Sequence, residues 1–127
     1  MSTASLSLRR LGGAALLSAL LLPAAAFPHA FPKKSDPAVG SVIAASPPMV
    51  RIWFNGYLEP LFNSLTVKNA AGKVVTQQPA RVDRDDPALL EVPLASLPTG
   101  EYHVYWHVTS KDGHHTEGDF TFTVSGR

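Results

Sequence analysis

The sequence contains no cysteine among its 127 residues. No disulfide bond can therefore stabilise the fold. The same absence excludes cysteine-ligated zinc, iron–sulfur clusters, blue-copper centres and thiol catalysis. Stability must come from a packed core, to which a bound metal ion could add.

Several other features are scarce. The 11 basic and 10 acidic residues form no basic stripe, so no nucleic-acid partner is expected. No segment shows sustained helical periodicity, and there is no internal repeat or low-complexity linker, which indicates one domain. No nucleophile and base stand in a recognisable context, so hydrolysis is not indicated and we expect no enzyme.

The first 28 residues predict a secretory signal peptide. Residues 1–10 carry Arg9 and Arg10 as their only charges, and residues 11–22 are apolar or small throughout. This run is shorter than the ~20 residues that a membrane-spanning helix needs. Small residues follow at 23–26, as at a cleavage site. We therefore expect export to the periplasm.

The cleavage point decides where the mature domain begins. Cleavage after residue 28 leaves a domain over residues 29–127, with His29 at its start. The pattern at residues 23–26 also permits cleavage after Ala26, which would leave two residues ahead of His29.

Short alternating segments, separated by proline and glycine, predict an all-β fold. Alternation of apolar and polar residues is typical of strands with one buried and one solvated face. About seven short strands with frequent turns favour a small Greek-key β-sandwich or barrel. The predicted strands are residues 50–54, 64–68, 73–76, 89–94, 101–110 and 119–124. Residues 81–87 are expected to be a charged surface loop. The aromatic residues expected in the core are Trp53, Phe54, Trp106, Phe120 and Phe122.

A candidate metal site lies in the loop between the last two predicted strands. Asp112-Gly113 favours a tight turn with positive φ. Such a turn can direct the Asp112 carboxylate and the His114 imidazole to one point, and these ligands suit copper(II) or zinc(II). The alternative is a hairpin turn with exposed polar residues.

His29 is the second candidate ligand. If cleavage leaves His29 at the N-terminus, its α-amine and imidazole can both bind one metal ion. An α-amine has a pKa of about 8, so it loses its proton to copper(II) at little cost near neutral pH. Together with Asp112 and His114 this gives three nitrogens and an oxygen, a donor set typical of copper(II). The alternative is a polar residue near a frayed terminus.

Several segments together resemble the CopC family of periplasmic copper-binding proteins, and the resemblance spans nearly all of residues 29–127. The combination is specific, whereas each segment alone is not. The similar segments are His29-Ala30-Phe31, Ser35 to Ser41, Val50 to Phe54, Leu97 to Tyr102 with Trp106, Ser110 to His114 and Glu117 to Phe122.

The resemblance implies a cupredoxin-like β-barrel and a role in periplasmic copper homeostasis or resistance. It implies one copper(II) ion per chain, bound by His29, Asp112 and His114, and a CopD-type inner-membrane transporter as partner. Some members also bind copper(I) in a methionine-rich loop. Because this chain has only Met1 and Met49, we expect no copper(I) site.

The remaining polar residues near the loop are weaker candidates. His103 and His107 lie about 13 Å apart along one strand face, too far for a common ion, and we expect both on the sheet surface. His115 is expected to be exposed rather than an auxiliary ligand. Glu117 and Asp119 are candidates to hydrogen-bond a ligand imidazole.

Two other functions compete with copper carriage. A histidine brace formed by an N-terminal His and a second His is also used by copper-dependent oxidases of polysaccharides. Such an enzyme needs an open axial position and a broad substrate face, so no polysaccharide partner is expected here. The other competitor is an immunoglobulin-like structural module with incidental histidines, which would bind no copper.

Overall fold

The computed structural model describes residues 2–4, 12 and 29–127. The predicted signal peptide over residues 1–28 thus lies outside the described residues, apart from residues 2–4 and 12. Within the described part of the chain, no helix has the length and apolar character needed to cross a membrane.

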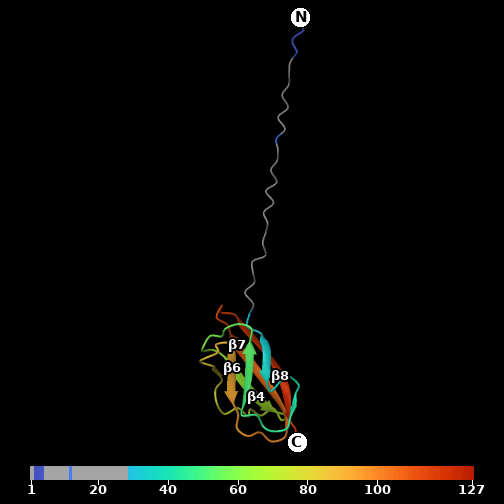
Figure 1. Cartoon of the computed structure of the whole chain (residues 1–127), viewed down its shortest axis with the longest axis vertical. Helices are drawn as coiled ribbons and strands as arrows, with labels where there is room; N and C mark the ends of the chain where they lie inside the picture. Colours follow the sequence, from blue (N-terminus) through green and yellow to red (C-terminus); the bar gives the residue numbers. More distant parts are fainter. Residues whose placement is uncertain (1, 5–11, 13–28) are drawn as a thin grey trace.

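Residues 29–127 fold into a sandwich of two four-stranded sheets (Figure 1). One sheet has the order β1 (Pro32–Asp36), β3 (Met49–Phe54), β6 (Leu89–Pro93) and β5 (Arg81–Val82). The other has the order β2 (Val42–Ile43), β8 (His115–Val124), β7 (Gly100–Thr109) and β4 (Ser64–Asn69). All pairs are antiparallel except β2 with β8. The predicted all-β sandwich is confirmed.

The core lies between the sheets and follows the alternation of the sequence. Strand β3 directs Val50, Ile52 and Phe54 inward, and each is at most 1% exposed. Since successive side chains point to opposite faces, one strand supplies the core with every second residue. The core also contains the inward residues of β7 and β8, which are Tyr102, Val104, Trp106, Val108, Phe120, Phe122 and Val124.

Trp53 corrects one prediction. Its neighbours Ile52 and Phe54 point inward, so Trp53 lies on the outer face of β3 and is only half-buried. Lys34 of the adjacent β1 covers it, with Nζ 4.2 Å from the ring centroid, as in a cation–π contact.

The predicted strand over residues 73–76 is much shorter than expected, although Val75 N donates a hydrogen bond to the Val67 carbonyl of β4. That segment has a single bridge, between Val74 and Lys68. The Asn69 side chain accepts hydrogen bonds from the backbone N–H groups of Ala71 and Lys73, so the chain turns tightly here.

Strand boundaries differ elsewhere. Strand β8 begins at His115 rather than at residue 119, because its pairing with β7 continues to the pair Thr109–His115. Part of the predicted charged loop, Arg81–Val82, pairs with β6 as the short strand β5. Strands β1 and β2 were not predicted.

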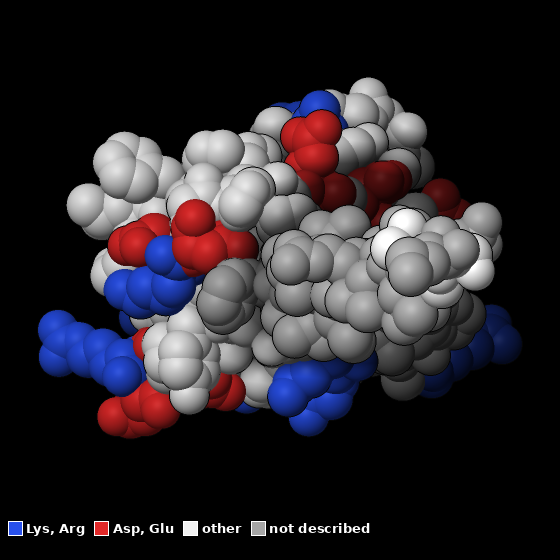
Figure 2. Space-filling view, turned by 90° about the horizontal axis from the view of Figure 1, so that it is seen from above, with Lys and Arg blue, Asp and Glu red and all other residues white. Residues whose placement is uncertain are grey.

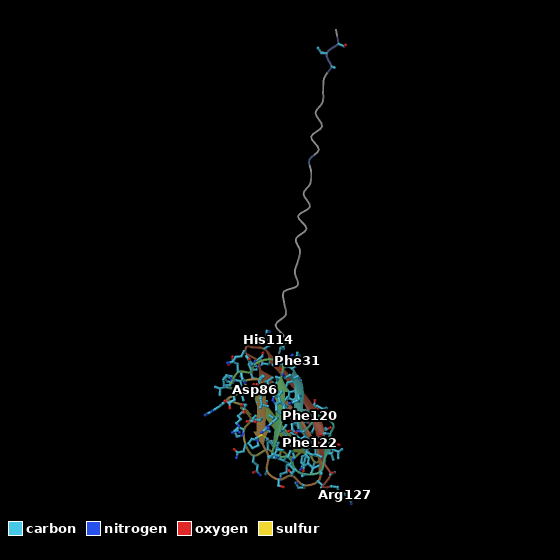
Figure 3. The ribbon with its side chains drawn as sticks, viewed as in Figure 1. Phe31, Asp86, His114, Phe120, Phe122 and Arg127 are labelled. Atoms are coloured by element: carbon cyan, nitrogen blue, oxygen red, sulfur yellow. The ribbon has the colours of Figure 1, made fainter. Side chains whose placement is uncertain are left out.

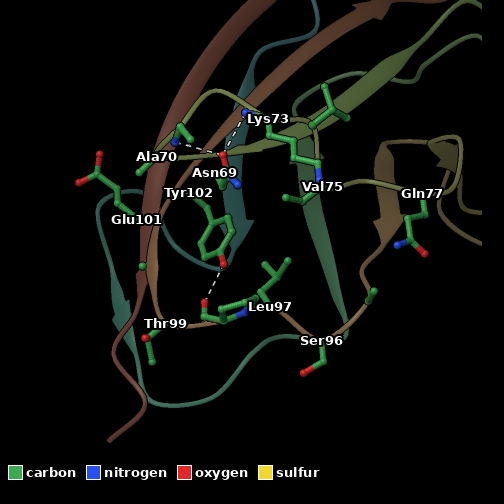
Figure 4. Close-up of a pocket in the computed structure, with 15 residues that line it drawn as sticks. Asn69, Ala70, Lys73, Val75, Gln77, Ser96, Leu97, Thr99, Glu101 and Tyr102 are labelled. Atoms are coloured by element: carbon green, nitrogen blue, oxygen red, sulfur yellow. Dashed lines mark hydrogen bonds between the residues drawn. The ribbon is translucent and has the colours of Figure 1, made fainter.

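The two ends of the sandwich differ in chemistry. Figure 4 shows a pocket of about 460 Å³ near the start of β7. There the Tyr102 hydroxyl donates a hydrogen bond to the Pro98 carbonyl, so its polar group serves the fold. Figure 3 places Phe31 and His114 together at the opposite end, away from Arg127.

Gly118 leaves room for the indole of Trp106, and Gly118→Ala should therefore destabilise the domain. An added Cβ would lie 2.5 Å from Cζ2 of Trp106, whose ring packs edge-on against Phe54 at a centroid distance of 5.3 Å. Overpacking of this kind costs about 1–3 kcal/mol. Denaturant unfolding measures the change. The exposed Glu101→Ala is the control and should stay within about 0.5 kcal/mol of the parent.

Candidate metal centre

The segment that carries His29 is fixed to the sandwich by its two following residues. Ala30 is fully buried, and its carbonyl accepts a 2.6 Å hydrogen bond from the Thr116 hydroxyl of β8. Phe31 and Asn55 exchange two hydrogen bonds of 2.9 Å, from Phe31 N to the Asn55 side chain and from Asn55 N to the Phe31 carbonyl. These contacts hold His29 beside the turn between β7 and β8.

The turn from Ser110 to His114 is closed by its own backbone. Ser110 N donates to the His114 carbonyl, and Gly113 N donates to the Ser110 carbonyl, each at 2.9 Å. Gly113 has φ of 86°, a conformation that glycine adopts without strain. The Asp-Gly pair therefore forms the tight turn that the sequence predicts.

The two oxygens of Asp112 have different partners. Oδ1 accepts hydrogen bonds from the Ser110 hydroxyl and from the His114 backbone N–H. Oδ2 faces the imidazoles, 3.1 Å from Nδ1 of His114 and 3.8 Å from Nδ1 of His29. The Ser110 hydroxyl, followed by the His114 N–H, lowers the pKa of Asp112 to about 2. The carboxylate is thus oriented and ionised before any ion arrives.

Three side chains converge at this end of the sandwich. His29, Asp112 and His114 each offer a donor atom within 4.8 Å of the other two. The imidazoles of His29 and His114 lie with ring centroids 4.3 Å apart. Nδ1 of His29 is buried and has no hydrogen-bond partner. An unpaired buried nitrogen facing a carboxylate oxygen fits a cation shared between them.

The structure places the weaker candidates elsewhere. Asp119 hydrogen-bonds His103 on the outer face of the sheet, so the expectation that it would support a ligand imidazole is wrong. His107 and His115 lie on the same face with their rings stacked. His115 is exposed, as expected. Glu117 pairs in register with His107, not with His114.

Sequence reasoning missed the residues that position the ligands. Ser110, which orients Asp112, and Asn55, which holds Phe31, were not among the predicted site residues. No signal in the sequence could pair Thr116 with Ala30, which is 86 residues away.

Exposed apolar side chains lie on the segments next to the centre. The loop of residues 55–63 lies against the turn, where Lys111 N donates to the Tyr57 carbonyl. We call Phe31, Tyr57, Leu61 and Phe62 the apolar rim, since all four are more than half exposed. Phe62 is 78% exposed, and its φ of 67° is rare for a bulky residue. Figure 2, which looks onto this end, shows acidic and basic residues interspersed around it.

Comparisons with known proteins agree with this architecture. The model of the CopC domain matches residues 32–125, a range that contains Asp112 and His114 and begins after His29. The chain is 33% identical to protein YobA of Escherichia coli K12 over 111 residues, which covers 87% of this chain and 90% of YobA. It is 32% identical over 110 residues to the copper transport protein CutJ of Bacillus subtilis, covering 86% of this chain and 20% of CutJ.

Two solved structures are similar. The crystal structure of CopC from Methylosinus trichosporium OB3b superposes with a TM-score of 0.73 at 35% identity, covering 76% of this chain and 94% of that one. PcoC from Escherichia coli, described as a methionine-rich copper resistance protein, gives a TM-score of 0.67 at 27% identity, covering 77% of this chain and all of that one.

Removal of the Ser110 hydroxyl should raise the pKa of Asp112 from about 2 toward its ordinary value of 3.8, because that hydroxyl is the main cause of the lowering. A lowered pKa stabilises the folded state above pH 4, and this contribution disappears as the pH falls through about 2. Ser110→Ala should therefore lose less stability than the parent on acidification. NMR titration of the Asp112 carboxyl carbon measures the pKa. Thr116→Val, which leaves the hydrogen bonds of Asp112 intact, should not change it.

Proposed function

The chain belongs to the CopC family, and we infer that its function is related to copper, because its relatives include proteins named for copper resistance and copper transport. We propose that it binds one copper(II) ion per chain, in the periplasm, and carries that ion for sequestration or delivery. The convergence of His29, Asp112 and His114 is the single observation that most strongly supports this proposal.

The donor set favours copper(II). Imidazole and carboxylate ligands suit divalent ions of this kind, and copper(II) binds such sites more tightly than the other divalent first-row metals. The Asp112 carboxylate is already ionised, and one of its oxygens is held by the turn. Little reorganisation is therefore required, so less entropy is lost when the ion binds.

The α-amine of His29 would complete the site. We propose that residues 1–28 are a signal peptide whose removal exposes this amine; cleavage after Ala26 would leave it two residues away. Nδ1 of His29 is the ring nitrogen nearer the backbone and the one that faces Asp112. Amine and Nδ1 of one residue can close a six-membered chelate ring around the ion, and His114 and Asp112 fill the remaining positions.

We do not propose a copper(I) site. PcoC is described as methionine rich, whereas this chain has two methionines. The sulfur of Met49 accepts a 2.9 Å hydrogen bond from Arg51, so it serves local packing. Soft thioether ligands are what copper(I) sites require.

We propose binding rather than catalysis. Oδ2 of Asp112 faces Nδ1 of both imidazoles, where it would crowd the open coordination position that a histidine-brace oxidase needs for oxygen. In an immunoglobulin-like module without metal, Nδ1 of His29 would stay buried and unpaired, and nothing would offset the free energy that its desolvation costs.

The main test is copper(II) affinity after His114→Ala. This change removes an imidazole but no core contact, because the His114 side chain is 61% exposed. Most copper(II) affinity should be lost while the unfolding midpoint stays near that of the metal-free parent. His103→Ala is the matched control on the outer face and should retain full affinity. Competition titration against a copper(II) chelator gives both values.

Intact mass of the exported parent, with and without copper(II), fixes the cleavage site and the stoichiometry together. One tightly bound copper per chain on a protein that begins at His29 is expected. Equal copper affinity in the parent and in His114→Ala would refute the proposed site.

A CopD-type membrane transporter is the proposed partner. The segment of CutJ that resembles this chain is only a fifth of that copper transport protein, so a domain of this kind works there beside a much larger part. The apolar rim adjoins the metal centre, and exposed aromatic residues near a site are typical of protein contact surfaces.

If the rim contacts the transporter, then Phe62→Asp should slow copper transfer to vesicles that contain such a transporter by about tenfold, which corresponds to about 1.4 kcal/mol. A charge at this position would be desolvated on contact. Copper(II) affinity should not change, because the Phe62 side chain is 78% exposed and is not among the three converging donors. The exposed Val74→Asp, near the opposite end, is the control. An unchanged transfer rate in Phe62→Asp would exclude the rim.

A further inference from the structure

A second group of potential metal ligands lies on the outer face of β7 and β8. The rings of His107 and His115 are stacked, with centroids 5.4 Å apart and an angle of 25° between their planes. Glu117 lies directly across from His107 in the antiparallel register. Because side chains alternate along a strand, Glu117 shares this face with His115, two residues away. Two imidazoles and a carboxylate thus lie on one patch of surface.

One hydrogen bond fixes which nitrogen of His115 is free. The Thr109 hydroxyl donates its only proton to the Phe62 carbonyl at 3.1 Å. The same hydroxyl oxygen lies 2.9 Å from Nδ1 of His115 and, with its proton directed to Phe62, is placed to accept a proton from that nitrogen. We therefore assign the neutral His115 ring to the tautomer with hydrogen on Nδ1, in which Nε2 carries a lone pair. A ligand imidazole whose other N–H is bonded to an oxygen is the usual arrangement in metal sites.

We propose that His107, His115 and Glu117 form a second metal site, which binds a divalent transition-metal ion such as copper(II) or zinc(II). Two imidazole nitrogens and a carboxylate oxygen, with water in the remaining position, match the ligand preferences of both ions. The site is independent of His29, so it does not require an exposed N-terminus.

The second site binds more weakly than the first. Among the described residues, only His29, Asp112 and His114 already bring three donor atoms within 4.8 Å. The stacked rings of His107 and His115 do not direct their lone pairs to one point, so His107 as well as the exposed Glu117 must rotate to complete the second site, and fixing these rotamers costs conformational entropy. An open depression of about 510 Å³, lined in part by His107 and Glu117 but not by His115, leaves two of the three side chains accessible to an ion from solvent.

His103 supplies a matched control. It lies on the same face of β7, four residues before His107, and its Nε2 is already bonded to Asp119. Its ring is stacked on Tyr105 rather than on another imidazole. Substitution of His103 should therefore leave the second site intact.

The first experiment measures the tautomer of His115 in the metal-free protein. Long-range ¹H–¹⁵N NMR should show hydrogen on Nδ1 of His115, the tautomer that Thr109 imposes. Thr109→Val should remove this preference and lower the zinc(II) affinity of the second site by about tenfold or more, as loss of an outer hydrogen-bond partner does. Hydrogen on Nε2 in the parent would overturn the proposed geometry.

The second experiment titrates zinc(II) into the His114→Ala variant, in which the first centre has lost a ligand. The ring nitrogens of His107 and His115 should shift together and saturate at one zinc per chain. His107→Gln and His115→Gln in this background should each weaken that binding by at least tenfold, whereas His103→Gln should not alter it.

The result separates this site from the proposed function. Suppose that zinc(II) binds through His107 and His115, while the parent protein binds no copper(II) at His29. This result would refute the first centre and support the second. Absence of saturable shifts at His107 and His115, or equal weakening by His103→Gln, would refute the second site alone.

Discussion

The proposed chemistry depends on the docking of the segment around Ala30 onto the end of the sandwich. Ala30 itself is fully buried, Thr116 holds its carbonyl, and Asn55 holds the following residue, Phe31. The Thr116 hydroxyl and the side-chain oxygen of Asn55 are occupied by these hydrogen bonds. Their hydrogen bonds offset the conformational entropy of an N-terminal segment that would otherwise be free. These contacts therefore hold His29 in a fixed position beside Asp112.

The turn from Ser110 to His114 contributes the other half of the centre. Ser110 and the backbone of His114 occupy one oxygen of Asp112 and leave the other facing the imidazoles. A ligand arranged in this way before the ion binds loses little entropy on binding. The same hairpin continues into β8, where His115 points to the outer face. Two adjacent histidines thus serve two different surfaces of one hairpin.

Differences between the predictions and the structure arise where tertiary contacts decide. Trp53 was expected in the core, yet its strand directs its neighbours inward and leaves it outside. The segment at residues 73–76 has strand-like composition, but after the turn that the Asn69 side chain closes it pairs with β4 only at Val74. Asp119 was expected beside a ligand, and instead it bonds His103 across the strand pair. Composition does not distinguish the two faces of a strand.

The sequence by itself determined the class of fold, the tight turn at Asp112-Gly113 and the chemistry of the candidate ligands, because alternation, turn residues and side-chain type are local properties. Only the tertiary structure decided that His29 lies within reach of His114, 85 positions further along the chain. That proximity depends on hydrogen bonds between Ala30 and Thr116, which are 86 residues apart. Contacts of such separation follow from how the sheets pack, and no local pattern encodes them.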